Sequence, residues 1–93
     1  MVWNYRLVRH VTRGIVDETL GEWYAVHEAY YTDNATEPEA ITEDPVSPAA
    51  ETLKELAKSY VMLSEAFGKP ALDAETFTYP PTRNGQSVLI RFR

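Results

Sequence analysis

The sequence predicts an α+β protein, in which an antiparallel sheet of about four to five strands carries one main helix packed on one of its faces. In residues 2–12 and 22–31, successive side chains would fall on opposite faces of a strand, and both segments are rich in aromatic and β-branched residues. This pattern is typical of half-buried strands. In residues 53–67, apolar residues recur every three or four positions, which is the spacing of one side of a helix. Because strands precede and follow this single helix, we expect a strand-strand-strand-helix core with further strands at its C-terminal end.

The first two strands are expected to pair as an antiparallel hairpin with a long loop. The connection "RGIVDETLG" is polar and is bracketed by Gly14 and Gly21, which is typical of such a loop. The segment after the hairpin, residues 32–51, is rich in proline and acids. It therefore allows only a short edge strand around residues 39–42.

The helix has the clearest local signals in the chain. Thr52, with Glu55 three residues later, forms a capping box that begins a helix at residue 53. Gly68 and Pro70 are typical of residues that follow a helix end. The predicted apolar side of the helix consists of Leu53, Leu56, Tyr60, Leu63 and Phe67.

Two strand candidates, "ETFTY" and "SVLIRFR", follow the helix. Asn84 and Gly85, between the two candidates, are typical of a type I′ hairpin turn. A hairpin with that turn would place Pro80 and Pro81 opposite hydrogen-bonding positions of the partner strand, where proline has no N–H to donate. We therefore expect a longer loop. We interpret residues 1–93 as one small domain, with a core at residues 1–72 and a C-terminal strand extension at residues 73–93.

Length and composition restrict the class of protein. A chain of 93 residues supports one hydrophobic core, and the lack of cysteine excludes disulfides and thiolate metal sites. The start, "MVWNYRLVRH", is too charged for a signal peptide, and no apolar run approaches the roughly 20 residues of a membrane span. The sequence therefore predicts a cytoplasmic protein that does not contact a membrane.

Charge is distributed unevenly along the chain. The net charge is -5, and residues 17–51 hold ten acids and no Lys or Arg, whereas residues 1–14 hold three Arg and no acid. Phosphate binding needs clustered Lys and Arg, so a nucleic-acid surface in the middle segment is not expected. The expected partner of that segment is a basic protein.

The pair His27-Glu28 in "EWYAVHEAYY" is the first candidate for chemistry. Neighbours in a strand project to opposite faces, so the two side chains do not act on one substrate unless a bulge intervenes. Burying His27 costs less than burying an unpaired Glu28 carboxylate. We therefore expect His27 to face the core, with the helix close to Ala25 and Ala29. The alternative is the reverse arrangement, with Glu28 in the core.

With His27 inward, an aromatic stripe surrounds Glu28 on the other face of the same strand. An exposed stripe of this kind marks a contact surface, and the alternative is that the C-terminal strands or the acidic loop cover it. The predicted partner-binding surface combines the stripe with acids of the following loop. It consists of Tyr24, Val26, Glu28, Tyr30, Glu37, Glu39, Glu43 and Asp44.

Catalytic and metal-binding patterns are weak. No Ser or Thr lies in a Gly-rich nucleophile turn, and the sequence has no Gly-rich phosphate loop. His10 and His27 are 17 residues apart and lack the i, i+4 spacing of a metal-binding pair. We expect no enzymatic activity, no cofactor and no metal. The alternative is a small hydrolase or metal-dependent enzyme that uses His27, Glu28 and the acidic loop.

Four segments, "WNYRLVR", "WYAVHEAYY", "EDPVSPAAETLKEL" and "GKPAL", resemble a group of short, uncharacterised proteins of bacteria and their mobile elements. This resemblance covers residues 3–72 and implies no activity. More distantly, the predicted hairpin, third strand and helix resemble the strand-strand-strand-helix unit of HicB-type antitoxins. That resemblance implies an inhibitor of a small basic RNA-cleaving toxin. Here Ala50-Glu51 replaces that family's Gly-Asp, and the chain offers no helix-turn-helix or basic arm for DNA.

The sequence thus predicts a non-catalytic protein-protein interaction module, in the manner of an acidic, antitoxin-like inhibitor of a basic partner. A homodimeric accessory protein, whose aromatic stripe or sheet edge pairs with itself, is the other alternative. Direct contact with nucleic acid is not expected.

Overall fold

A computed structural model describes the chain except for residues 1, 17–18, 82–86 and 93. The described residues form one α-helix and a six-stranded sheet with the order β4-β1-β2-β3-β6-β5. Neighbouring strands run antiparallel except β1 and β4, which run parallel. The fold is α+β, as predicted, with one strand more than the expected range.

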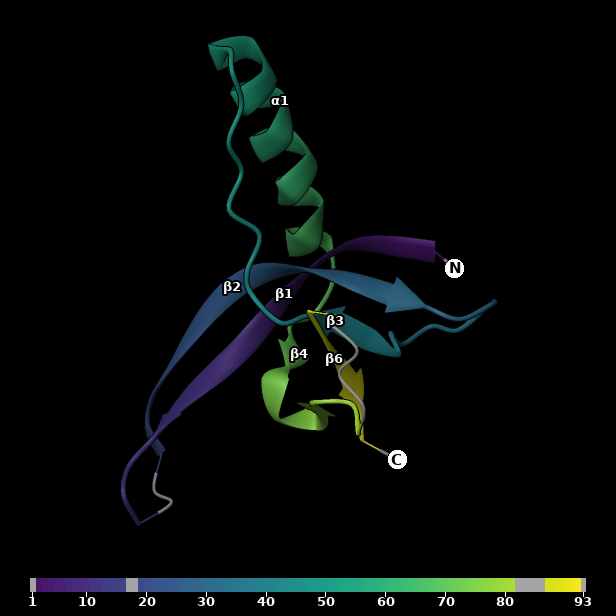
Figure 1. The fold of residues 1–93 in the computed structure, drawn as a ribbon. Coiled ribbons are helices and arrows are strands. Elements are labelled where there is room, and N and C mark those ends of the chain that lie inside the picture. The colour runs from purple at the N-terminus through teal and green to yellow at the C-terminus, as the bar shows by residue number, and fades with distance from the viewer. Residues whose placement is uncertain (1, 17–18, 82–86, 93) are drawn as a thin grey trace.

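A long hairpin of two strands dominates the sheet (Figure 1). β1 (Val2–Arg13) pairs with β2 (Thr19–Tyr31) over their whole lengths, from Val2 opposite Tyr31 to Arg13 opposite Thr19. The register shifts once, between Thr12 and Arg13. The alternating pattern of the sequence therefore predicted both strands and their antiparallel pairing.

The remaining strands are short. β3 (Ala40–Thr42) is the short strand expected near residues 39–42, and it pairs with the end of β2. The prediction that it is an edge strand is wrong, because β6 (Val88–Arg91) pairs with its other side. β5 (Phe77–Thr78) follows a 3-10 turn, η2 (Ala74–Thr76), and pairs with β6. The C-terminal extension thus continues the sheet of residues 1–72. The Asn84-Gly85 turn signal lies outside the described residues.

β4 (Leu72–Asp73) was not expected from the sequence. It adds to the other side of β1, where Val8 lies opposite Leu72 and Arg9 opposite Asp73. A strand is recognised in a sequence by alternating apolar and polar residues, and two residues are too few to show that alternation. This pairing is therefore seen only in the folded structure.

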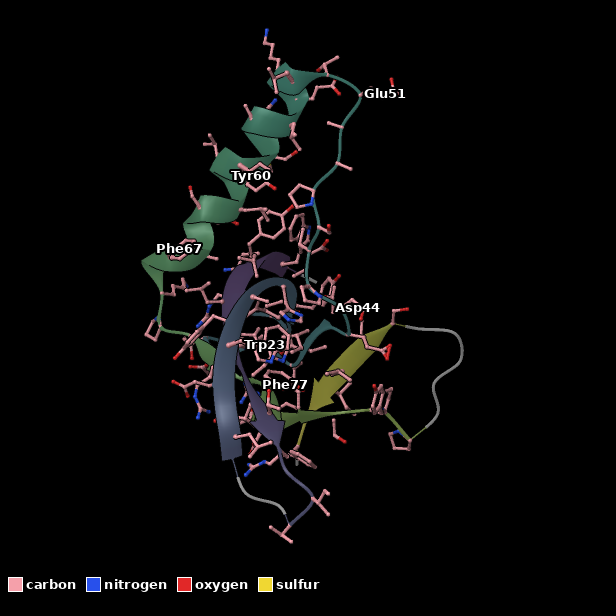
Figure 2. The ribbon with its side chains drawn as sticks, turned by 90° about the vertical axis from the view of Figure 1, so that its left-hand side faces the viewer. Trp23, Asp44, Glu51, Tyr60, Phe67 and Phe77 are labelled. Atoms are coloured by element: carbon pink, nitrogen blue, oxygen red, sulfur yellow. The ribbon has the colours of Figure 1, made fainter. Side chains whose placement is uncertain are left out.

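The core lies on one face of the hairpin, where the short strands curl toward it. Its buried members come from five strands and are Val8, Ala29, Tyr31, Ile41, Leu72 and Phe77. In Figure 2, Phe77 lies among the strands, whereas Tyr60 lies on the helix above them. The expectation that the helix approaches this face at Ala25 and Ala29 is wrong, because side chains of β4 and β5 fill that space.

The helix, α1 (Leu53–Leu63), begins where the capping signal predicted. The Thr52 side chain accepts a hydrogen bond of 3.1 Å from the backbone N–H of Glu55. A 3-10 turn, η1 (Ser64–Gly68), then continues the helical path to the predicted stop at Gly68. The capping residue Thr52 and the stop at Gly68 therefore predicted where this helical segment begins and ends.

The prediction that α1 packs on a face of the sheet is wrong. The helix projects from the sheet (Figure 1), and Leu63 in its last turn is its buried residue, whereas Leu53 is 82% exposed. η1 holds the helix to the edge of β1, where the Tyr5 N–H donates to the Glu65 carboxylate at 3.2 Å. The preceding segment, with Pro45 and Pro48, leads the chain away from the sheet before α1 begins.

These projections make the molecule extended. The radius of gyration is 14.6 Å, whereas a compact chain of this length has about 12 Å. The helix and the loop end of the hairpin project in different directions (Figure 1). Both carry exposed apolar side chains, including Leu53 on the helix and Ile15 near the hairpin loop.

Candidate functional site

The structure separates His27 from Glu28. His27 is fully buried on the core face of β2, as expected, while Glu28 is half-buried on the other face and accepts a 2.9 Å hydrogen bond from the Tyr30 hydroxyl. The pairing with β1 is regular here, so no bulge turns the two side chains to one side. His27 and Glu28 therefore do not form a joint site.

His27 instead meets the other histidine of the chain. The two Nε2 atoms are 2.9 Å apart, and His27 Nδ1 lies 2.9 Å from the carbonyl oxygen of Thr42. Because a carbonyl only accepts, His27 Nδ1 carries the proton, and His27 Nε2 accepts from His10. The His10 ring stacks on Trp23, with ring centroids 4.0 Å apart.

Burial keeps both histidines neutral. Desolvation lowers the pKa of His10 below its ordinary value of 6.5, and the nearby His27 lowers it further. Desolvation also lowers the pKa of His27, against the opposing effects of the Thr42 carbonyl and the Asp44 carboxylate. A neutral pair of this kind can share one hydrogen bond. Among the described residues, no three metal-binding side chains are grouped around a common point.

Sequence reasoning missed this pair because the two residues are 17 positions apart. The available signal was the hairpin register, in which His10 lies opposite Trp23 and both share the core face with His27. Small Ala25 lies between Trp23 and His27 on that face, which leaves room for the rings to approach.

The predicted aromatic stripe lies on the outer face of β2, but most of it is partly covered. Tyr24 is 55% exposed, whereas Val26, Glu28 and Tyr30 are half-buried. Burial, together with the bond to Glu28, raises the pKa of Tyr30. The stripe is therefore open to a partner mainly at Tyr24.

The predicted acids lie along and beside β3, so the eight predicted residues do not form one patch. Glu37 lies 3.7 Å from Arg91 of β6, and the Glu43 N–H donates to the Ser87 carbonyl at 2.8 Å. Glu39 is half-buried between β2 and β6. Asp44 is exposed where the chain leaves the sheet (Figure 2).

A free stretch of β2 edge adjoins Tyr24 and was not predicted. Tyr30 and Val26 present their carbonyls to the β3 side, where they accept from Glu39 and Val46. Alternate residues of a regular strand point their backbone groups the same way, so Tyr24 and Glu22 do so too, as far as the register shift between Gly21 and Thr19. No strand of the described chain pairs with them on this side, since β3 reaches only Ala29 and Tyr30.

The opposite edge of the hairpin is covered by charge. β4 pairs with β1 at Val8 and Arg9, the Arg9 guanidinium lies 3.5 Å from Asp73, and Arg13 pairs with Glu75 of η2. Arg9 also forms a 2.6 Å ion pair with Glu22 across the hairpin. The hydrogen bond with Glu22 is the main reason that the pKa of Arg9 is raised. Such charged cover is a common protection against strand pairing, so the two edges differ in their accessibility.

The projecting helix presents a second unpredicted surface. Leu53, Tyr60 and Val61 are 82%, 58% and 70% exposed and recur at a spacing that places them on one side of α1. The sequence showed an amphipathic helix and suggested that its apolar side is buried. In the folded chain, only the last turn of the helix is buried, at Leu63.

No family model matches this chain, and neither a curated protein nor a solved structure shows significant similarity to it. Among the described residues, no helix is long and apolar enough to cross a membrane.

Proposed function

We propose that this chain is a non-catalytic interaction module that binds a basic protein partner along the free edge of β2. The observation that carries this proposal is the edge of β2 at Glu22 and Tyr24, with which no strand of the described chain pairs and on which the Tyr24 side chain is 55% exposed. Unpaired N–H and C=O groups in a row are a template for an added strand.

Charge supports a basic partner. The ten acids of residues 17–51 have no Lys or Arg among them, and this segment includes the free edge and the exposed Asp44. The net negative charge of this segment accelerates encounters with a positive protein, while backbone pairing and Tyr24 determine how long the complex lasts.

The antitoxin-like role is part of the same proposal. β1, β2, β3 and α1 follow one another along the chain in the order that the HicB-type resemblance implies. An acidic inhibitor that adds its sheet edge to a basic enzyme would use the features described above. No residue of the chain needs to react with a substrate for this function.

The test uses the substitution Tyr24→Pro. Proline removes the outward N–H and adds a ring at the edge, but the Tyr24 N–H is not part of the β1–β2 ladder. Native-host lysate is passed over the immobilised wild-type protein, Tyr24→Pro and a matched control, Tyr60→Ala on α1. Bound proteins are identified by mass spectrometry, and the affinity of the purified partner is then measured at low and high salt.

We expect a basic protein that the wild type and Tyr60→Ala retain and that Tyr24→Pro binds roughly tenfold more weakly, because edge hydrogen bonds are lost. Its association rate should fall with salt. A partner that binds Tyr24→Pro equally well, or binds independently of salt, would contradict the proposal. Circular dichroism of Tyr24→Pro establishes that the sheet is intact.

A homodimer is a second candidate, and the exposed side of α1 favours it. Leu53, Tyr60 and Val61 form an apolar surface that a second helix of the same kind would bury. Two copies of α1 packed against each other would remove these side chains from water without using the free edge of β2.

A further inference from the structure

The core face of β1 contains a buried cation without a counter-ion. Asn4, Arg6 and Val8 follow one another on this face, and Arg6 is only 4% exposed. Its Nη1 donates to the Tyr31 hydroxyl and its Nη2 to the Pro70 carbonyl, both at 2.9 Å. The Nε of Arg6 has no hydrogen-bond partner within the described part of the chain. No carboxylate of the described chain pairs with this guanidinium.

Such an arrangement is costly unless an anion completes it. A buried charge loses its hydration, and neutral acceptors such as a hydroxyl and a carbonyl return only part of that free energy. The cost falls if a negative charge lies close to the guanidinium.

A pocket lies directly next to this cation. It has a volume of about 420 Å³, within the range of small-ligand sites, and opens between the start of β1, the end of β2 and Lys69. Asn4, the neighbour of Arg6 on the same face, and Tyr31, its hydrogen-bond partner, both line it. The buried charge of Arg6 therefore lies just behind the pocket wall.

The pocket is lined by groups that donate hydrogen bonds. The Tyr31 hydroxyl accepts from Arg6, and its own proton has no acceptor among the described residues. Lys69 forms no ion pair with any part of the chain that is described. The lining also includes Thr32, Thr36 and Asn34, whose side chains are able to donate hydrogen bonds, and the apolar Val2.

We propose that this pocket binds a small organic anion through an oxyanion group, either a carboxylate or a phosphate. The Tyr31 hydroxyl, polarised by Arg6, and the Lys69 ammonium donate to the oxyanion. This site is separate from the β2 edge and does not depend on the protein partner proposed above.

The test is a titration of the 15N-labelled full chain followed by amide chemical shifts. The probes are inorganic phosphate and acetate, with chloride at matched ionic strength as the reference. We expect a saturable response of the amides of Asn34, Ala35, Thr36 and Lys69. A response to phosphate alone assigns a phosphate ligand, and a response to acetate alone assigns a carboxylate.

Two variants and one control locate the binding. Lys69→Ala, at an exposed position, should weaken binding roughly tenfold, since one charge-assisted hydrogen bond is lost. Tyr31→Phe keeps the ring in the core and should also weaken binding, with melting monitored to establish that it folds. Lys58→Ala on α1 should bind as the wild type does. Shifts that chloride reproduces, or an unchanged affinity in Lys69→Ala, would overturn the proposal.

Discussion

His10 and His27, from opposite strands of the hairpin, share a hydrogen bond between their Nε2 atoms, which lie 2.9 Å apart. The carbonyl of Thr42 fixes the tautomer of His27, and Trp23 covers the ring of His10. Only one proton fits between the two nitrogens. The pair is therefore stable with both rings neutral and becomes unfavourable when both rings are protonated.

Stability should fall with acidity because the pKa of each histidine is lowered in the folded chain. The unfolded chain, with ordinary values near 6.5, binds protons first, so the stabilisation is present above about pH 6.5 and is lost as pH falls through the folded pKa. The slope is at most about 1.4 kcal/mol per pH unit for each proton. Urea unfolding between pH 8 and pH 5 measures it.

A matched pair of variants separates this effect from general acid sensitivity. His10→Phe keeps a ring against Trp23 but removes one titrating group, so its stability should depend less on pH in the same window. Lys58→Ala, on the remote helix, should retain the full dependence. A wild-type stability that is constant or rises from pH 8 to pH 5 would contradict the assigned tautomers and burial.

The two ends of α1 should differ in their contribution to stability. Leu63→Ala removes a buried side chain and should cost about 2 to 4 kcal/mol, whereas Leu53→Ala, at an exposed position, should change the free energy of unfolding by less than about 0.5 kcal/mol. Half-buried Leu56 should give an intermediate loss. Chemical denaturation with unchanged m-values measures these differences, and equal losses at Leu53 and Leu63 would mean that the whole helix is packed.

The homodimer candidate predicts a change of mass without a change of fold. Tyr60→Glu places a charge on the exposed side of α1, where it would disrupt helix pairing between copies but no contact within the core. Sedimentation velocity should show a dimer for the wild type and a monomer for Tyr60→Glu, with Lys58→Ala as the control. A monomeric wild type at high concentration would rule this candidate out.

Local signals predicted most of the secondary structure. The alternation in residues 2–12 and 22–31 indicated the hairpin, and Thr52 with Gly68 marked the ends of the helical segment. The orientation of His27 followed from the cost of burying Glu28. Each of these features could be predicted because it depends only on residues that are close together in the sequence.

The positions of the elements could not be predicted in the same way. The contact of His10 with His27 requires the hairpin register and the curl of the sheet together. The pairing of Val8 with Leu72 joins distant segments through a strand of two residues. It also fills the core face that the helix was expected to cover, which is why an amphipathic helix projects here instead of packing on the sheet.

The charged cover of the β1 edge has a consequence for biosynthesis. Arg9 and Asp73 are 64 positions apart, so the ribosome completes the β1–β2 hairpin long before it adds Asp73 and Glu75. During that interval the nascent chain exposes both edges of a hairpin that is rich in aromatic residues. Two nascent chains on one messenger could then pair through the edge of β1, which the finished protein protects. The β1 edge at Val8 and Arg9 is therefore covered only after residues 72–75 have been added to the chain.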